Sequence, residues 1–185
     1  MSCRTLAAIL AVTTCVASTS SSVVHAAPLF DELRFGAVGS IEKNGNREEG
    51  AFVSGIVFFD PFGHDEASGW EKLARPRVHV GGDISTAGEA NQLYAGFSWT
   101  YDITDWLFLE GGFGGTIHDG KLDEDPNPGP KLGSAVLFHE YAAVGFKLDA
   151  NWRLVANIEH SSHAGLADGP NSGLSRAGVM IGYKF

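Results

Sequence analysis

Residues 152–159 read WRLVANIE, and the alternation of their side chains decides the fold. Apolar side chains occupy every second position, namely Trp152, Leu154, Ala156 and Ile158. The positions between them are mostly polar and comprise Arg153, Val155, Asn157 and Glu159. Side chains two residues apart lie on the same face of a β-strand. The stretch is therefore expected to be a strand with one apolar face and one mixed face.

The same alternation recurs along the chain between polar, Gly-rich or Pro-rich breaks. It predicts eight strands, at about 33–40, 51–59, 76–86, 91–101, 106–118, 137–148, 152–163 and 174–185. Segments of about ten residues with this pattern are typical of transmembrane barrels, whose apolar face meets lipid and whose mixed face fills the lumen. The expected fold class is all-β, an eight-stranded antiparallel transmembrane β-barrel of the outer membrane.

Aromatic residues gather at one set of the expected strand ends: Trp99, Tyr101, Trp106, Trp152, Tyr183 and Phe185. In an up-and-down meander these ends lie at one membrane interface, where an aromatic girdle is expected. A soluble lipocalin-like barrel or sandwich would show the same alternation. The one-sided aromatic ends and the terminal aromatic residue favour the membrane.

Residues 1–26 have the pattern of a secretory signal peptide, with Arg4, an apolar run over 6–17 and a small-residue end at Ala26. The apolar run is shorter than the roughly 20 residues that a membrane-spanning helix needs. We expect export, cleavage after Ala26, and a mature chain of residues 27–185 that forms a single barrel domain in the bacterial outer membrane.

The composition limits the chemistry that the mature chain can perform. Both cysteines, Cys3 and Cys15, lie in the expected signal peptide. No disulfide, thiol nucleophile or cysteine metal ligand is therefore expected after cleavage. The chain has 13 basic and 22 acidic residues and no basic cluster, which argues against a nucleic-acid partner.

A histidine and a serine follow the apolar row of the expected seventh strand. His160 and Ser162 share a face, and by parity it is the lipid-facing one. A neutral imidazole can take the proton of a hydroxyl and make the serine a nucleophile, which could attack the ester of a lipid near the outer leaflet. The alternative is that both residues only mark the polar membrane interface. A metal site at His160 and His163 is not expected, because residues three apart on a strand point to opposite faces.

Three elements near the C-terminus occur together: His160-x-Ser162-His163-Ala164-Gly165-Leu166, Pro170-Asn171-x-Gly173 and the final Gly182-Tyr183-Lys184-Phe185. They resemble the PagL-type lipid A deacylases, also called the acyloxyacyl hydrolase family. The resemblance implies an eight-stranded outer-membrane barrel that removes the ester-linked acyl chain at the 3 position of lipid A. It also implies a serine–histidine–glutamate triad on the outer barrel wall, lipopolysaccharide as substrate, and no metal or organic cofactor.

Carried over from the family pattern, His160 matches the general base and Ser162 the nucleophile. The family has an asparagine after the serine that helps to form the oxyanion hole, and His163 stands in that place here. Because histidine can also donate a hydrogen bond, the resemblance implies an oxyanion site near His163 and the backbone of Ala164 and Gly165.

The acid of the family's triad falls near the start of the last strand, at about Ser175 or Leu174, and neither is a carboxylate. A substitute is expected on the other neighbouring strand. If residues 149–151 form a three-residue turn, Glu140 lies opposite His160 on the lipid-facing side. Directly opposed Cβ atoms are about 4.5–5.5 Å apart, so this carboxylate could orient the imidazole as a triad acid does. The alternatives are an interfacial carboxylate without this role, or a register off by one residue that turns Glu140 inward.

Two functions follow from these observations. The leading hypothesis is an outer-membrane serine esterase that acts on lipid A, with Glu140 or Ser175 orienting the base. The alternative is a non-catalytic small outer-membrane barrel, structural or adhesive, that kept the motif after losing the acid.

Overall fold

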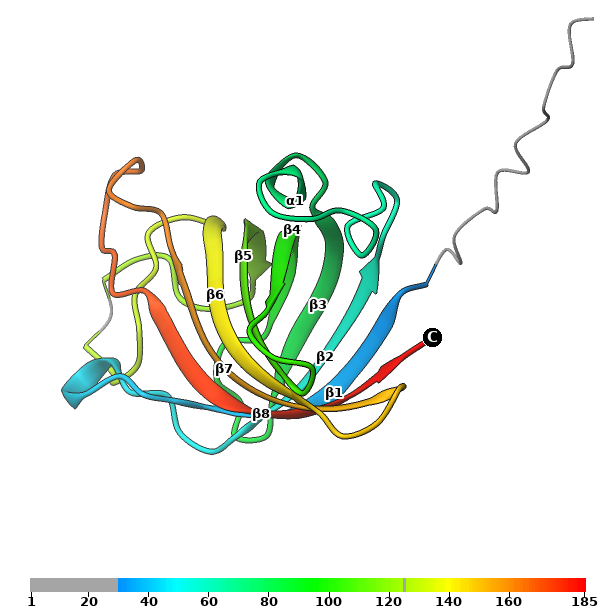
Figure 1. Ribbon diagram of the computed structural model, residues 1–185. Helices are drawn as coiled ribbons and strands as arrows, with labels where there is room; N and C mark the ends of the chain where they lie inside the picture. The colour runs from blue at the N-terminus through cyan, green and yellow to red at the C-terminus, as the bar shows by residue number, and fades with distance from the viewer. Residues whose placement is uncertain (1–29, 125) are drawn as a thin grey trace, which may run out of the picture.

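A closed antiparallel barrel of eight strands forms in the computed structural model, which describes residues 30–124 and 126–185 (Figure 1). Each strand pairs with the next one along the chain, and the last pairs with the first. The strands are β1 (Glu32–Ser40), β2 (Phe52–Phe59), β3 (Arg77–Ser85), β4 (Gln92–Asp102), β5 (Leu107–His118), β6 (Val136–Lys147), β7 (Trp152–Ser162) and β8 (Leu174–Lys184). The expected fold class is confirmed, and the strand ends agree with the sequence pattern to within one residue.

Helical structure in the described ranges is limited to one 3₁₀ turn, η1 (Asn44–Asn46), and one α-helical turn, α1 (Glu71–Ala74). No helix in these ranges has the length and apolar character needed to cross a membrane. The expected signal peptide, residues 1–26, lies outside the described residues.

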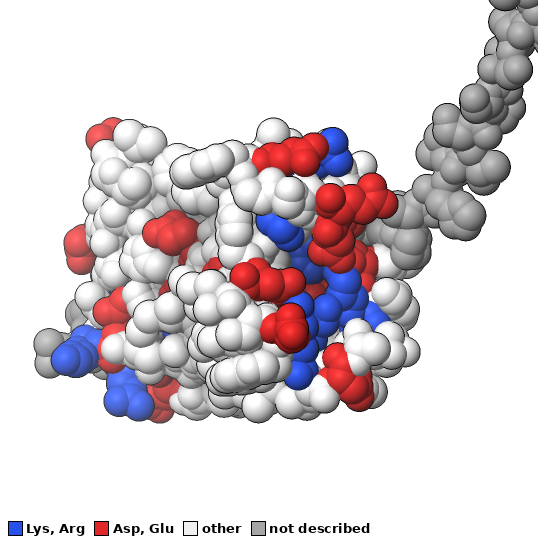
Figure 2. All heavy atoms as spheres, viewed as in Figure 1, with Lys and Arg blue, Asp and Glu red and all other residues white. Residues whose placement is uncertain are grey.

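The alternation of side chains between the outer wall and the lumen is clearest in β7. Leu154 and Ile158 are 41 % and 50 % exposed on the outer wall, whereas Val155 and Glu159 are buried inside. This is the arrangement of a barrel that presents apolar side chains to lipid. In Figure 2 charged atoms concentrate at one barrel end and fewer lie at the opposite end, while much of the visible wall between them is uncharged.

Charged side chains fill the lumen in two clusters centred on arginines. In the cluster nearer the chain ends, Arg34 contacts Glu32 at 2.6 Å and Glu110 at 2.7 Å. At the opposite end, Arg176 contacts Glu48 at 2.7 Å and Asp83 at 3.2 Å. Eight strands leave an interior just wide enough for side chains, and the charges of Arg34 and Arg176 are stable there because carboxylates hydrogen-bond both guanidinium groups.

The turn between β6 and β7 fixes the register that matters for the site. Asp149 Oδ1 accepts hydrogen bonds from the backbone N–H of Trp152 at 2.7 Å and of Asn151 at 2.8 Å. These two bonds hold the pKa of Asp149 below its usual value. The N–H of Leu148 donates to the carbonyl of Trp152 at 2.9 Å, which closes a three-residue turn. Continued along both strands, this register pairs Glu140 with His160.

Successive connections alternate between the two ends of the barrel, because each strand runs antiparallel to the one before it. One end has the connections 41–51, 86–91, 119–135 and 163–173, and the other has both ends of the sheet, two tight turns and the segment 60–76 that contains α1. Aromatic side chains pack at this second end, where the ring of Trp152 lies 5.1 Å from that of Tyr183 and the ring of Trp106 lies 5.9 Å from that of Phe146. Segment 60–76 is held against β4 because Trp99 Nε1 donates to the carbonyl of Leu73 at 3.1 Å.

Candidate active site

His160 and Ser162 lie on the outer wall at the end of β7 that leads into the 163–173 connection. Both side chains are partly exposed, whereas Ser161 between them is 1 % exposed and points into the lumen. Ser161 is engaged there, because His139 Nδ1 lies 3.0 Å from its Oγ and the hydroxyl donates to Gln92 Oε1 at 3.1 Å. Of these two serines, Ser162 is therefore the one that is accessible from outside the barrel wall.

The imidazole of His160 is held by the neighbouring strand β8. Its Nδ1 lies 2.8 Å from Ser175 Oγ, and the two residues are register partners in the β7–β8 pairing. With the Nδ1 proton donated to Ser175, Nε2 keeps the lone pair that a general base needs. Ser175, one of the two positions at which the resemblance places the family's acid, thus contacts His160 directly.

Gly173 forms the surface against which this imidazole packs. The residue has φ +70°, and a Cβ placed on it would lie 2.7 Å from His160 Cε1 and 3.3 Å from His160 Nε2. Position 173 therefore requires glycine for two reasons. Its backbone conformation is one that residues with a side chain rarely adopt, and a Cβ would collide with the imidazole of His160. The Pro170-Asn171-x-Gly173 motif is in this way linked physically to the histidine.

Glu140 lies on the other side of His160. It is the register partner of His160 in the β6–β7 pairing and faces outward at intermediate burial. Within the described residues, however, no hydrogen bond or ion pair joins the Glu140 carboxylate to His160; the imidazole makes its hydrogen bond with Ser175 on the opposite strand. The expected register pairing of Glu140 with His160 is present, whereas the expected contact between the carboxylate and the imidazole is absent in the ranges that the structure describes.

The side chain of His163 is 4 % exposed, and both of its ring nitrogens are used inside the 163–173 connection. Nδ1 accepts the backbone N–H of Ala167 at 3.3 Å, so Nε2 carries the proton and donates to the carbonyl of Pro170 at 3.1 Å. The backbone N–H of His163 donates to Asn171 Oδ1 at 3.2 Å. In this conformation the imidazole holds the loop together and offers no free donor to an oxyanion, contrary to its expected role.

The two residues after His163 offer backbone N–H groups as hydrogen-bond donors. Ala164 and Gly165 have φ of 52° and 74°, two consecutive residues in the left-handed region. Their N–H groups make no hydrogen bond with any residue that the structure describes, and both residues are exposed. Two backbone N–H groups, two and three positions after Ser162, are therefore available to a ligand.

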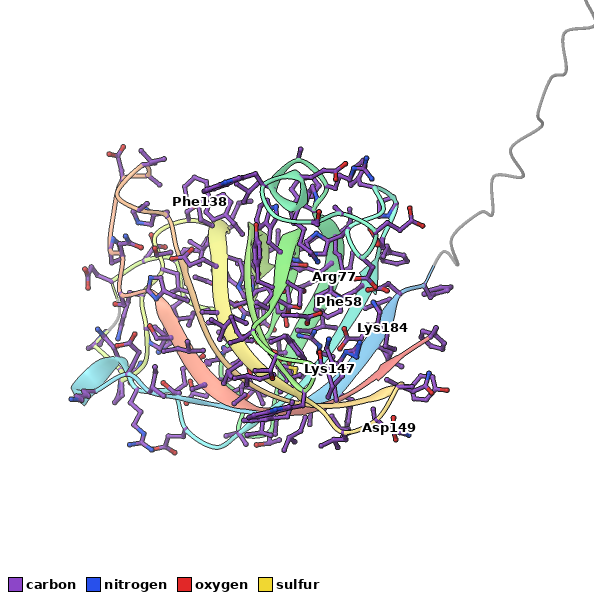
Figure 3. The ribbon with its side chains drawn as sticks, in the orientation of Figure 1. Phe58, Arg77, Phe138, Lys147, Asp149 and Lys184 are labelled. Carbon is purple, nitrogen blue, oxygen red and sulfur yellow. The ribbon has the colours of Figure 1, made fainter. Side chains whose placement is uncertain are left out.

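An apolar recess of about 440 Å³ lies beside the loop, between it and the outer ends of β5 and β6. Its lining includes Phe113, Val136, Phe138, Leu166 and Ala167. Phe138, labelled in Figure 3, projects from β6 on this side of the barrel, and its ring stacks on that of Phe113 at 5.8 Å. Such a recess suits a hydrocarbon chain.

A family model for the lipid A 3-O-deacylases, PagL, matches residues 67–184, which is more than half of the chain. The chain belongs to the PagL family. Its members are ester hydrolases that act on lipid A in the outer membrane, so the sequence resemblance is confirmed.

Solved structures show the same fold. The crystal structure of the outer membrane enzyme PagL is 19 % identical, with 84 % of this chain and 99 % of that chain covered and a TM-score of 0.59. A de novo designed transmembrane β-barrel is 12 % identical, with 86 % and 98 % covered and a TM-score of 0.52. At these identities the likeness concerns the fold. No curated protein matches the chain.

The group that contacts the His160 imidazole is the hydroxyl of Ser175, and not the carboxylate that the resemblance implies. Asn171 is a further candidate that spacing alone did not single out. Its Oδ1 is bound by the backbone of His163, and its Nδ2 has no hydrogen-bond partner within residues 30–124 and 126–185. Across the same residues, no group of three or more His, Cys, Asp or Glu side chains is placed to hold a metal ion.

Proposed function

We propose that this chain is an outer-membrane serine esterase that removes the acyl chain at the 3 position of lipid A, with Ser162 as nucleophile and His160 as general base. The observation that carries the proposal is the 2.8 Å contact between His160 Nδ1 and Ser175 Oγ on the outer wall beside Ser162. It leaves the second ring nitrogen available as a base, in a chain that belongs to a family of lipid A deacylases.

The reaction proceeds in two acyl transfers. Ser162 Oγ bonds to the acyl carbonyl carbon as its proton passes to His160 Nε2, and the carbonyl electrons move onto the oxygen. Collapse of this intermediate breaks the carbon–oxygen bond to the sugar, whose oxygen takes the proton back from Nε2. Water then attacks the acyl-serine with the same proton transfers and releases the fatty acid. The hydrogen bond between Ser162 and His160 forms as substrate enters, since catalytic contacts often tighten only in the complex.

The oxyanion is stabilised by the backbone N–H groups of Ala164 and Gly165, which make no hydrogen bond with any residue that the structure describes. The Nδ2 group of Asn171 is a third donor on the same loop. His163 contributes through the loop: its hydrogen bonds to Pro170 and Ala167 hold the backbone that carries these donors. Donors fixed in advance stabilise the developing charge without reorganisation.

Ser175 and Glu140 together take the role of the triad carboxylate, which this chain lacks near the start of β8. Ser175 Oγ accepts a hydrogen bond from Nδ1–H in the tautomer that leaves Nε2 as the base, but a neutral hydroxyl stabilises imidazolium less than a carboxylate does. Glu140, the register partner of His160 on β6, supplies negative charge near the imidazole without a hydrogen bond to it. The apolar recess beside Phe138 and Leu166 receives part of the hydrocarbon of the substrate.

The proposal is tested by mass spectrometry of lipid A after incubation with the purified, refolded barrel. Wild type should release one acyl chain, and Ser162→Ala or His160→Ala should lower the rate by at least about 1000-fold while the barrel stays folded. Ser161→Ala is the matched control, since its hydroxyl faces the lumen. Wild-type protein that leaves lipid A intact would support the non-catalytic barrel instead.

A further inference from the structure

The barrel has a second polar recess, at the end opposite the candidate active site. Its volume is about 240 Å³, and it is lined by three acidic and five basic side chains, the latter being Lys72, Arg77, Lys147, Arg153 and Lys184. Figure 2 shows basic atoms in one band across this mouth, bordered by acidic ones. Because the proposed active site belongs at the outer leaflet, this mouth opens to the periplasm.

Arg153 is the exceptional side chain of the mouth. It is 9 % exposed, lines the recess, and its guanidinium donates no hydrogen bond to any residue in the described ranges. One of its terminal nitrogens, Nη1, is fully buried without a partner. A guanidinium has five N–H donors, and a buried charge left without hydrogen bonds is costly.

The nearest carboxylate cannot satisfy Arg153. Glu32 Oε2 lies 3.8 Å from Arg153 Nε, beyond hydrogen-bonding distance. That carboxylate already accepts two hydrogen bonds from Arg34, at 2.6 and 3.1 Å, and one from Arg77 at 3.0 Å. The phenyl ring of Phe108 covers the guanidinium from another side, with its centroid 5.9 Å from Cζ. The donors of Arg153 therefore lack an acceptor within the barrel.

Two lysines at the rim can contribute charge to the same recess. Lys147 Nζ lies 2.8 Å from Asp102, and Lys184 Nζ contacts Asp31 and Asp65. The side chains of Asp102 and Asp65 are 55 % and 47 % exposed, so these two ion pairs are weak. The pair of Lys184 with Asp31 is mostly buried, with side chains 17 % and 9 % exposed, so Lys147 is the lysine that can exchange partners. The three residues Lys147, Lys184 and Arg77 line this recess, and Figure 3 shows them on the same side of the barrel.

We propose that this mouth binds a phosphate group presented from the periplasmic side. The Arg153 guanidinium would donate a pair of N–H groups to two phosphate oxygens, the geometry in which arginine binds this anion best. Lys147, whose ion-pair partner Asp102 is exposed, supplies further positive charge. The recess exceeds a single phosphate ion in size, so it also has room for part of the molecule that carries the phosphate.

The site is tested by isothermal titration calorimetry, in which inorganic phosphate is added to the protein in a maltoside detergent that itself contains no phosphate. Chloride replaces phosphate in the reference buffer, so that the ionic strength stays constant. Wild type should bind one phosphate saturably, and Arg153→Gln should weaken binding at least tenfold. Lys147→Gln, at the accessible rim, gives a second test that leaves the lumen intact, with weaker binding expected. Arg75→Gln is the control, because Arg75 is exposed and pairs with Glu71 outside the recess.

A second arm separates the sources of the phosphate. Protein in phosphatidylcholine vesicles is compared with protein in vesicles containing phosphatidylglycerol, and the unfolding temperature is followed with and without added phosphate. A rise on adding free phosphate that needs Arg153 supports a soluble ligand, whereas a rise with phosphatidylglycerol alone that needs Arg153 supports a lipid headgroup. Absence of saturable binding in both arms, or equal binding by wild type and Arg153→Gln, would overturn the proposal. Lipid A deacylation by Arg153→Gln should be unchanged, because the two sites lie at opposite ends.

Discussion

Replacing Gly173 by alanine is expected to impair catalysis more than stability. The added Cβ would lie 2.7 Å from His160 Cε1, whereas ordinary contact begins at 3.4 Å, so the imidazole must retreat by about 0.7 Å. A displacement of 1 Å at a catalytic group costs about 100-fold in rate. We therefore expect kcat to fall about 30- to 100-fold. The positive φ adds about 1–2 kcal/mol of backbone strain to the folded state.

The matched control for this substitution is Gly169→Ala. Gly169 lies in the same connection with φ +99°, and its added Cβ would meet only Gly133 Cα at 3.7 Å. Both variants should lose similar stability in urea titrations of the refolded barrel, whereas only Gly173→Ala should lose activity in the lipid A assay. Equal activities of the two variants would refute the argument that Gly173 positions the imidazole.

Three further predictions follow from the arrangement around His160 and from the fold. Ser175→Glu places a carboxylate beside Nδ1 and should raise kcat about 10- to 100-fold, whereas Ser175→Ala should lower it; the opposite order would mean that the hydroxyl is not orienting the base. Glu140→Gln should lower kcat about tenfold with little change in KM, because the charge acts across one strand; an unchanged rate would leave Ser175 as the only support. The chain should fractionate with outer membranes and migrate differently in gels before and after heating; recovery in the soluble periplasmic fraction without detergent would contradict the membrane assignment.

Much of the fold follows from the period-two pattern, because a wall between lipid and lumen forces apolar and polar side chains to alternate. That requirement fixed the parity of β7 and separated the outward Ser162 from the inward Ser161. The three-residue turn at 149–151 then fixed which residue of β6 faces His160. Both inferences need only the geometry of the backbone.

Side-chain contacts were less accessible from the sequence. A histidine between two strands can turn to either neighbour, and periodicity does not say that His160 bonds Ser175 and not Glu140. The hydrogen bonds of His163 depend on how the 163–173 connection folds, which no strand pattern describes. The pairing of Arg34 with Glu110 likewise joins residues 76 positions apart across the lumen.

Covalent labelling tests the central claim most directly, that a serine on the lipid-facing wall is the nucleophile. The refolded barrel is treated with a fluorophosphonate, which reacts with activated serines, and the modified peptide is located by mass spectrometry. The account predicts modification of Ser162 in wild type and its loss in His160→Ala. Labelling of Ser161, or lipid A deacylation that persists in Ser162→Ala, would contradict it.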